Sequence, residues 1–304
     1  MTTENNKQGN FRRGIFLLFF SAASFSLSLV LANKAIQAGT TPLTISLARY
    51  SISALLMVPF LIITGRTFKL PKDPGYVFFI CILGFLVLGL TLTYVGSVQY
   101  IPVSLAVLIF YTNPFLVALV ARALDGTPLT PLRLGAMAMA FLGLGLALEI
   151  WDAINLDWRG LALAAGASLT LTGIYIISGR AMRKVDSQTL SFHAFVVATV
   201  FAALATLLTG GPVWPTVDEG WLWLFLTAIF YAMGQSFVFA GIAEAGPVSS
   251  SLIMNMEPVF TIIFALLLLG ERLHPVQSVG AALVIAAVFV VSRRPAKDPA
   301  GDGR

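Results

Sequence analysis

Three ionisable side chains lie inside long apolar stretches of this sequence, and their types and positions make them the first candidates for chemistry. Glu257 lies near the middle of one stretch, Arg49 lies roughly two helical turns into another, and His193 lies near the start of a third. A charge in the middle of a lipid bilayer costs roughly 2.5–3.5 kcal/mol on insertion scales. If these stretches cross a membrane, each of these side chains needs a partner, a proton or a function.

Each of the three has a functional and a structural interpretation. Glu257 could take up and release a proton, or it could hydrogen-bond backbone groups that Pro258 frees and so fix its helix. Arg49 could bind an anionic ligand, or it could snorkel outward or brace a neighbouring helix. His193 is expected at a membrane interface as a neutral side chain, although it could serve as a ligand or proton relay. The sequence leaves these alternatives open.

Uncharged polar residues within the apolar stretches mark a candidate cavity. Their tips can hydrogen-bond inside an otherwise apolar wall, which suits an amphipathic organic ligand. Together with Arg49, the set consists of Ser24, Tyr94, Tyr111, Asn113, Tyr175, Tyr231, Gln235 and Asn255. Ser24 shares one helix face with Ser21 and Ser28, and small hydroxylated residues also serve helix packing in membranes, which is the favoured interpretation for these serines.

The elements that position these residues must be membrane helices. Hydrophobic residues make up 58% of the chain and charged residues 11%, against roughly 45–50% and 25% in soluble domains. The apolar stretches are continuous and do not alternate with polar residues, which disfavours a β-barrel and predicts an all-α membrane protein. Ten spans are expected, at residues 14–33, 43–64, 75–95, 101–121, 132–149, 160–179, 188–209, 220–243, 247–269 and 275–292.

The distribution of charge predicts how these spans are oriented. Most of the 19 Lys and Arg residues fall in the tails and in alternate loops, so the positive-inside rule predicts both termini in the cytoplasm of a multi-pass protein of the cell (inner) membrane. Tryptophan prefers membrane interfaces. All five tryptophans fall in or beside predicted outer loops, at Trp151, Trp158, Trp214, Trp221 and Trp223.

Two proline dipeptides reveal an internal repeat. Asn113-Pro114 and Glu257-Pro258 are each followed by a glycine and then a proline at matching distances, namely Gly126 with Pro131 and Gly270 with Pro275. Pro102-Val103-Ser104 likewise matches Pro247-Val248-Ser249. A five-helix unit crosses the membrane an odd number of times, so its second copy enters upside down. Inverted repeats suit alternating access, and Pro114 and Pro258 are candidate hinges or sites of static curvature.

This repeat predicts five segments of the chain. They are a cytoplasmic tail at 1–13, a first five-helix repeat at 14–149, an outer connecting loop at 150–159, a second five-helix repeat at 160–292 and a second cytoplasmic tail at 293–304. A cavity is expected between the two halves, near the bilayer midplane.

The ninth predicted span and its exit resemble the EamA-type branch of the drug/metabolite transporter superfamily. The matching residues run from Met256-Glu257-Pro258-Val259-Phe260 to Leu269-Gly270-Glu271-Arg272-Leu273, and Arg49 within Leu47–Tyr50 also matches. The first half departs from the pattern, with Asn113 in place of the acid and Asp125-Gly126 in place of Gly-Glu. The resemblance implies a secondary transporter that exports a small metabolite, such as an amino acid or a related amphipathic compound.

Other function classes lack the residues they need. The sequence has no phosphate-binding loop for ATP, no lysine within a span for a retinal, and no cluster of metal ligands, because His193 and His274 are predicted near opposite membrane faces. We therefore expect no enzyme, no cofactor, no metal and no nucleic-acid partner. The single cysteine, Cys81, is expected to pack inside the protein.

The expected partners are a small-molecule substrate, membrane lipid and, as a coupling ion, protons. An importer on the same scaffold and a non-transporting membrane protein that binds a ligand remain alternatives. The chain could act as a monomer or as a homodimer.

Overall fold

The computed structural model describes residues 2–149, 157–269 and 274–292, and this part of the chain is built of helices. Their order is α1 Thr2–Gln37, α2 Pro42–Ile63, α3 Pro74–Ser97, α4 Val103–Phe110, α5 Asn113–Asp125, α6 Pro131–Ala147, α7 Trp158–Ala181, α8 Ser187–Leu208, α9 Asp218–Ala245, α10 Pro247–Ile253, α11 Met256–Leu269 and α12 Pro275–Ser292. Nine segments are long and apolar enough to cross a membrane, and α6 is a shorter apolar helix. The predicted all-α fold of about ten spans is confirmed.

Most of these helices begin at a local signal in the sequence. A capping side chain followed by proline starts α2 at Thr41, α3 at Asp73 and α6 at Thr130, since the cap accepts a free backbone N–H and proline fits the first turn. Asp157 and Asp186 cap α7 and α8 in the same way. The short connections between spans therefore follow directly from the residue types there.

The fourth and ninth predicted spans differ from expectation because each is divided into two helices. One break separates α4 from α5 at residues 111–112, and the other separates α10 from α11 at residues 254–255. Pro114 is the second residue of α5 and Pro258 the third residue of α11. Neither proline can donate a hydrogen bond to the carbonyl four residues earlier, which explains why each half-helix ends where it does. The prolines thus lie just after a break and not within a continuous helix.

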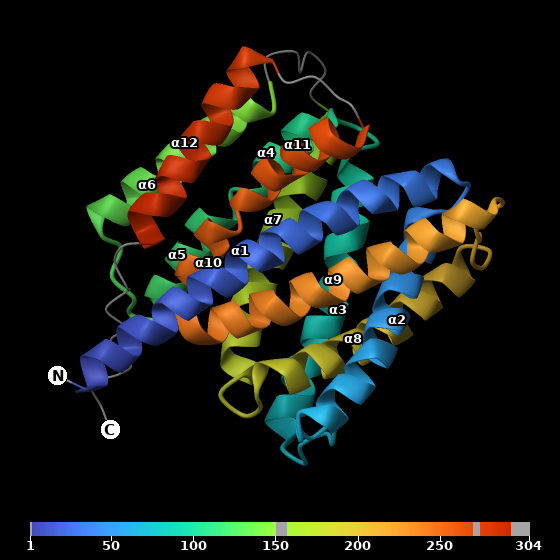
Figure 1. The fold of residues 1–304 in the computed structure, drawn as a ribbon, viewed down its shortest axis with the longest axis horizontal. Helices are drawn as coiled ribbons and strands as arrows, with labels where there is room; N and C mark the ends of the chain where they lie inside the picture. The colour runs from blue at the N-terminus through green and yellow to red at the C-terminus, as the bar shows by residue number, and fades with distance from the viewer. Residues whose placement is uncertain (1, 150–156, 270–273, 293–304) are drawn as a thin grey trace.

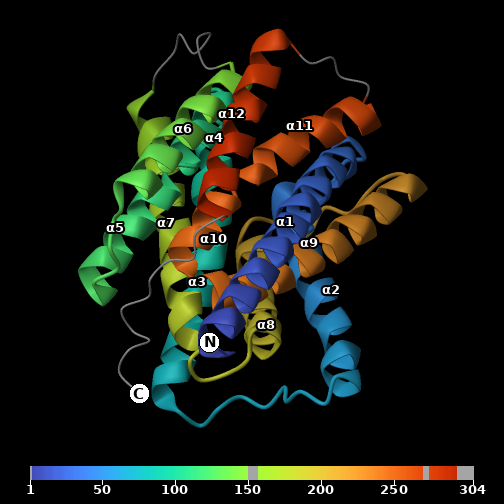
Figure 2. The ribbon, with the colours of Figure 1, turned by 60° about the vertical axis from the view of Figure 1, so that its left-hand side comes forward.

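The two halves of the chain interlock and do not form separate bundles. α1 of the first half packs along α9 of the second, and in the reciprocal pairing α7 packs along α3 (Figure 1). α2 packs on α8, and α6 packs on α12 at one edge of the bundle (Figure 2). Each half therefore completes the packing of the other.

Two ends of the bundle can be distinguished by the connections they carry. The end where α1 begins, here named the N-terminal face, also holds the α2–α3 and α7–α8 connections and the junction of α9 with α10 (Figure 2). The opposite face holds the α1–α2 and α8–α9 connections, joined by the hydrogen bond from the Thr216 N–H to the Ala38 carbonyl at 3.0 Å. The predicted outer loop at 150–159 lies mostly outside the described residues, as does the family-like exit at 270–273.

Cys81 contradicts the expectation that it packs inside the protein. It lies on the outer side of α3 and is exposed. An apolar stretch of a membrane helix has a lipid-facing side as well as a protein-facing side, and the sequence around Cys81 does not distinguish them.

Candidate functional site

Glu257 lies in the first turn of α11, immediately after the break that follows α10. The Ser26 hydroxyl of α1 donates a hydrogen bond to the Glu257 backbone carbonyl at 2.6 Å. This contact ties the start of α11 to the middle of α1. The position brings a carboxylate to the centre of the bundle, where it retains partial accessibility.

Four tyrosines surround this carboxylate. The Tyr111 hydroxyl is a hydrogen-bond partner of Glu257, and the hydroxyls of Tyr94, Tyr175 and Tyr231 lie within its electrostatic reach. These side chains come from α3, the α4–α5 break, α7 and α9, and therefore from both halves of the chain. Four of the predicted cavity residues thus converge on the predicted acid.

Arg49 of α2 supplies the positive charge of this site. Its guanidinium carbon lies 4.1 Å from the centroid of the Tyr231 ring and 5.5 Å from that of the Tyr50 ring. Its charge attracts the Glu257 carboxylate, while its buried Nε has no hydrogen-bond partner. Because Arg49 is held over aromatic rings and forms no ion pair with another described residue, part of its hydrogen-bonding capacity is free for a ligand. We name Glu257, Arg49 and the four tyrosines the Glu257 cluster.

Aromatic residues that the sequence did not single out pack against the tyrosines of the Glu257 cluster. The ring centroids of Tyr50 and Phe25 lie 5.5 Å and 5.3 Å from that of Tyr231, and the Tyr50 hydroxyl lies 3.2 Å from the Thr91 hydroxyl. The Phe110 ring contacts the Tyr94 ring at a tilt and the Tyr111 ring edge to face, at centroid distances of 5.3 Å and 5.0 Å. Tyr50 could have been inferred from its place beside Arg49, but nothing in the sequence separates Phe25 or Phe110 from the other phenylalanines.

Asn113 and Asn255 lie at the two symmetric helix breaks. They are 1% and 2% exposed, and the side-chain oxygen of each has no hydrogen-bond partner within the part of the chain that the structure describes. A buried polar atom without a partner is costly, so each oxygen is available to accept a hydrogen bond from a bound ligand. Ser24 and Gln235 are also buried, at 6% and 8% exposed, but no contact with the Glu257 cluster identifies them as part of it.

The neighbouring serines of α1 have a packing role, as favoured from the sequence. The Ser21 hydroxyl donates to the Gly234 carbonyl at 2.7 Å, and the Ser28 hydroxyl donates to the Thr227 carbonyl at 2.9 Å. Both acceptors belong to α9, the helix that runs along α1. These bonds fasten the first half of the chain to the second.

His193 is engaged in structural contacts away from this cluster. Its Nδ1 lies 2.7 Å from the buried Tyr76 hydroxyl, and its Nε2 lies 3.1 Å from the Phe68 carbonyl in the α2–α3 connection. Both ring nitrogens therefore have a partner. Among the described residues, no group of three or more His, Cys, Asp and Glu side chains could hold a metal ion.

Comparisons with known proteins were made for the whole chain. The model of the EamA-like transporter family matches twice, at residues 12–148 and 158–293, which agrees with the two halves of the fold. The chain is 27% identical over 203 residues to the threonine/homoserine exporter RhtA of Escherichia coli K12, a match that spans 66% of this chain and 65% of that protein.

Two relatives match over a greater length. The exporter of the same name in Salmonella typhimurium LT2 is 24% identical across 86% of this chain and 88% of its own length. The uncharacterized transporter YyaM of Bacillus subtilis is 25% identical across 90% of both. A solved crystal structure superposes with a TM-score of 0.79 over 92% of this chain and 99% of that one, at 18% identity, so it shows the same fold.

Proposed function

Because the chain belongs to the EamA-like transporter family, we propose that it is a secondary active transporter that exports a small zwitterionic metabolite, an amino acid or a related amphipathic compound. One observation carries this proposal. Opposite charges, Glu257 and Arg49, lie within electrostatic reach of each other inside the membrane-spanning bundle, among aromatic side chains from both repeats. The exporters of threonine and homoserine among the relatives support the same class of substrate.

The chemistry of the cluster fits a zwitterion. The free Nε–H of Arg49 would donate to the substrate carboxylate, and the Glu257 carboxylate would accept from the ammonium group. The tyrosine rings would cover the apolar part of the substrate, while the oxygens of Asn113 and Asn255 would accept from its remaining donors. Both charges of the cluster would then have a partner of opposite charge when substrate is bound.

Proton coupling would follow from competition at Glu257. A carboxylate enclosed in a bundle is stabilised either by an ammonium group or by a proton, and the two cannot occupy it together. Substrate would leave toward one side, a proton would take its place, and the bundle would return. The helix breaks beside Pro114 and Pro258 would be the hinges of this movement.

The direction of transport rests on the orientation of the bundle. The N-terminal face carries the basic side chains Arg12, Arg13, Arg66, Arg122 and Lys184, which supports a cytoplasmic location for that face and for both termini. The bacterial relatives support the inner membrane. Export would then run from the N-terminal face to the opposite face.

Transport into sealed vesicles tests this function. Purified protein in liposomes of known orientation would be loaded with labelled amino acids, with and without a proton gradient. We expect counterflow of at least one small amino acid and acceleration by the gradient. No movement of any compound in a broad metabolite panel would favour a non-transporting ligand-binding protein, and gradient-driven movement only toward the N-terminal face would favour an importer.

Glu257 variants separate coupling from a structural role. Glu257→Gln keeps the shape and hydrogen-bonding capacity of the side chain but cannot titrate, so exchange of substrate should become independent of pH while the protein is still produced and folded. Glu257→Asp, the control that still titrates, should keep a pH-dependent rate. Loss of folded protein in both variants would assign Glu257 to fixing α11.

A further inference from the structure

Two short half-helices occupy equivalent places in the two repeats but are enclosed very differently. α10 lies in the half of the bundle next to the N-terminal face, and all its residues from Val248 to Ile253 are buried. α4 lies in the half next to the opposite face, and only Ala106 and Leu108 are buried there. α10 is packed by α1, α5, α7, α9 and α12, whereas α4 is packed by α3, α6 and α7.

One pair of equivalent residues shows this difference directly. Ser249 follows Pro247-Val248 in the second repeat, and Ser104 follows Pro102-Val103 in the first. Ser249 is 2% exposed and its hydroxyl has no partner, whereas Ser104 remains partly accessible. In an inverted repeat, exchanging the two environments would exchange the side on which the bundle is open. In this structure the half-helix next to the N-terminal face is therefore enclosed, whereas its counterpart next to the opposite face is not.

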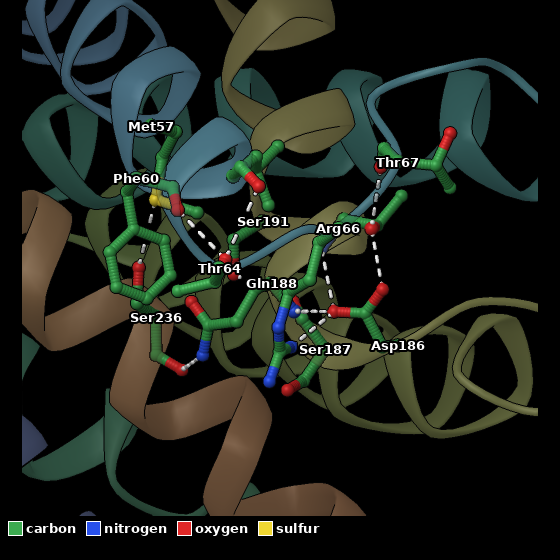
Figure 3. A network of polar contacts seen from close by, with 12 residues as sticks. Met57, Phe60, Thr64, Arg66, Thr67, Asp186, Ser187, Gln188, Ser191 and Ser236 are labelled. Atoms are coloured by element: carbon green, nitrogen blue, oxygen red, sulfur yellow. Dashed lines mark hydrogen bonds and ion pairs between the residues drawn. The ribbon is translucent and has the colours of Figure 1, made fainter.

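Charged contacts bridge the two repeats at the closed end. The Arg66 guanidinium of the α2–α3 connection pairs with the Asp186 carboxylate at the start of α8, and Lys184 pairs with Asp73 at the start of α3. The Thr189 hydroxyl also lies 2.9 Å from the Thr67 carbonyl oxygen and within hydrogen-bond distance of the Asp186 carboxylate. Figure 3 shows Arg66 and Asp186 pointing toward each other across these segments.

The same network reaches a third helix. The Gln188 side-chain amide donates to the Ser236 carbonyl of α9 at 3.3 Å, and the Ser236 hydroxyl lies 3.5 Å from the Met57 sulfur of α2 (Figure 3). In Figure 2 the α2–α3 connection runs as an extended segment below α8. The ends of α2, α3, α8 and α9 that lie toward the N-terminal face are therefore held together by polar contacts.

At the equivalent junction of the opposite face, Lys34, Asp218 and Glu219 are present but form no ion pair among the described residues. Inversion of the repeat pairs the α2–α3 connection with the α8–α9 connection, and the α7–α8 connection with the α1–α2 connection. There the Thr216 N–H donates to the Ala38 carbonyl at 3.0 Å, and the Val213 N–H donates to the Thr44 hydroxyl at 2.9 Å. Ion pairs bridge one junction, and neutral hydrogen bonds bridge the other.

We propose that the pairs Arg66–Asp186 and Lys184–Asp73 form a latch that holds the N-terminal gate shut and makes the state open to the opposite face the resting state. This inference rests on the proposed transport by alternating access. The latch sits where the two repeats must separate for the Glu257 cluster to open toward the N-terminal face. Breaking it exposes α10 and encloses α4, because one end of the bundle opens as the other closes.

Cysteine labelling measures both ends of the bundle without substrate. In a Cys81→Ser background, a single cysteine is placed at Ser249 or at Ser104, and its rate of reaction with a polar maleimide is recorded in purified protein. The latch is broken by Asp73→Asn with Asp186→Asn, since asparagine still caps α3 and α8. A second variant, Arg66→Gln with Lys184→Gln, breaks it from the other side.

We expect both latch variants to speed labelling of Ser249→Cys by about tenfold and to slow labelling of Ser104→Cys. Glu149→Gln, which removes the pair between Glu149 just after α6 and His274 just before α12 at the opposite face, is the matched control and should change neither rate. Unchanged rates overturn the latch, and so does faster labelling at both positions, which reports loosening of the fold. The readout needs no transport, so it stands even if the vesicle assay finds no substrate.

Discussion

The Arg49 guanidinium lies over the face of the Tyr231 ring, 4.1 Å from its centroid, and this contact joins α2 of the first repeat to α9 of the second. An arginine held by an aromatic face keeps its N–H groups directed away from the ring and free for other acceptors. The relationship explains how a cation can reside inside the bundle without a direct ion pair. It also makes the ring, more than the hydroxyl, the part of Tyr231 that positions Arg49.

Variants of Tyr231 test whether its ring or its hydroxyl positions Arg49. Tyr231→Leu removes the ring, and a desolvated cation–π contact is worth about 2 kcal/mol, so we expect the KM for substrate to rise by about tenfold or more. Tyr231→Phe keeps the ring and should change KM by less than about threefold. Transport by Tyr100→Leu, at an exposed tyrosine of the α3–α4 connection, should match the parent. An equal loss in the Phe and Leu variants would assign the effect to the hydroxyl.

The crossing of α6 and α12 makes a prediction about stability. A Cβ added at Gly280 would lie 2.3 Å from the Ala147 backbone nitrogen and 2.5 Å from the Gly143 carbonyl oxygen, and backbone atoms cannot give way as a flexible side chain can. Gly280→Ala should therefore lower the free energy of unfolding by about 1–3 kcal/mol, measured by thermal unfolding in detergent.

Gly135 is the matched control for this crossing. It lies on α6 with nothing within 4 Å of an added Cβ. Gly135→Ala should leave the protein as stable or raise its stability by up to about 1 kcal/mol, because alanine favours helix. Equal destabilisation by both changes would mean that close packing of α6 on α12 is not what Gly280 provides.

Much of the fold follows from local features of the sequence, whereas the site follows only in part. The length of the apolar stretches predicts the spans, and capping side chains followed by proline begin several of the helices, as at Asp73 and Thr130. The charge expected of Glu257 and Arg49 identified the centre of the cluster, because charge in a membrane is costly wherever the helices pack. These features depend on each segment alone.

The parts of the fold and the site that the sequence did not predict depend on how the helices pack against one another. Periodicity could not show that Tyr50 and Phe25 pack against Tyr231, or that Cys81 faces outward, because membrane helices are apolar on the lipid side as well as the protein side. The sequence predicts hinges or static curvature at Pro114 and Pro258, and it does not predict the breaks at 111–112 and 254–255, since proline is often tolerated within a membrane helix. These features depend on contacts between residues that lie far apart in the sequence.

The latch has a predicted pH dependence. The ion pair with Lys184 and the Gly75 N–H hold the pKa of Asp73 below its usual value. Partial burial raises the pKa of Asp186, but hydrogen bonds from Thr189 and the pairing with Arg66 outweigh it and leave that pKa lowered as well. A lowered pKa keeps its stabilising effect above the ordinary value near 3.9 and loses it only as the pH falls through the native pKa.

Labelling of Ser249→Cys should therefore be insensitive to pH between about pH 6 and pH 8, after division by the rate for the same thiol in unfolded protein. Transport itself should still vary with pH through Glu257. A corrected labelling rate that climbs steadily across this range would show that groups other than Asp73 and Asp186 hold the gate.

Asn113 and Asn255 make a final prediction, in which stability and function move in opposite directions. The unpartnered oxygen of each side chain is a cost to the empty protein, so replacing it with a leucine of comparable size removes a penalty of about 1–3 kcal/mol. Asn113→Leu and Asn255→Leu should unfold at higher temperature, yet transport more slowly, because the substrate loses an acceptor. Asn33→Leu, at an exposed position of α1, should change neither property. If the variants at the breaks instead lose stability and transport together, the two asparagines serve the fold and the site must be sought among the tyrosines and Glu257 alone.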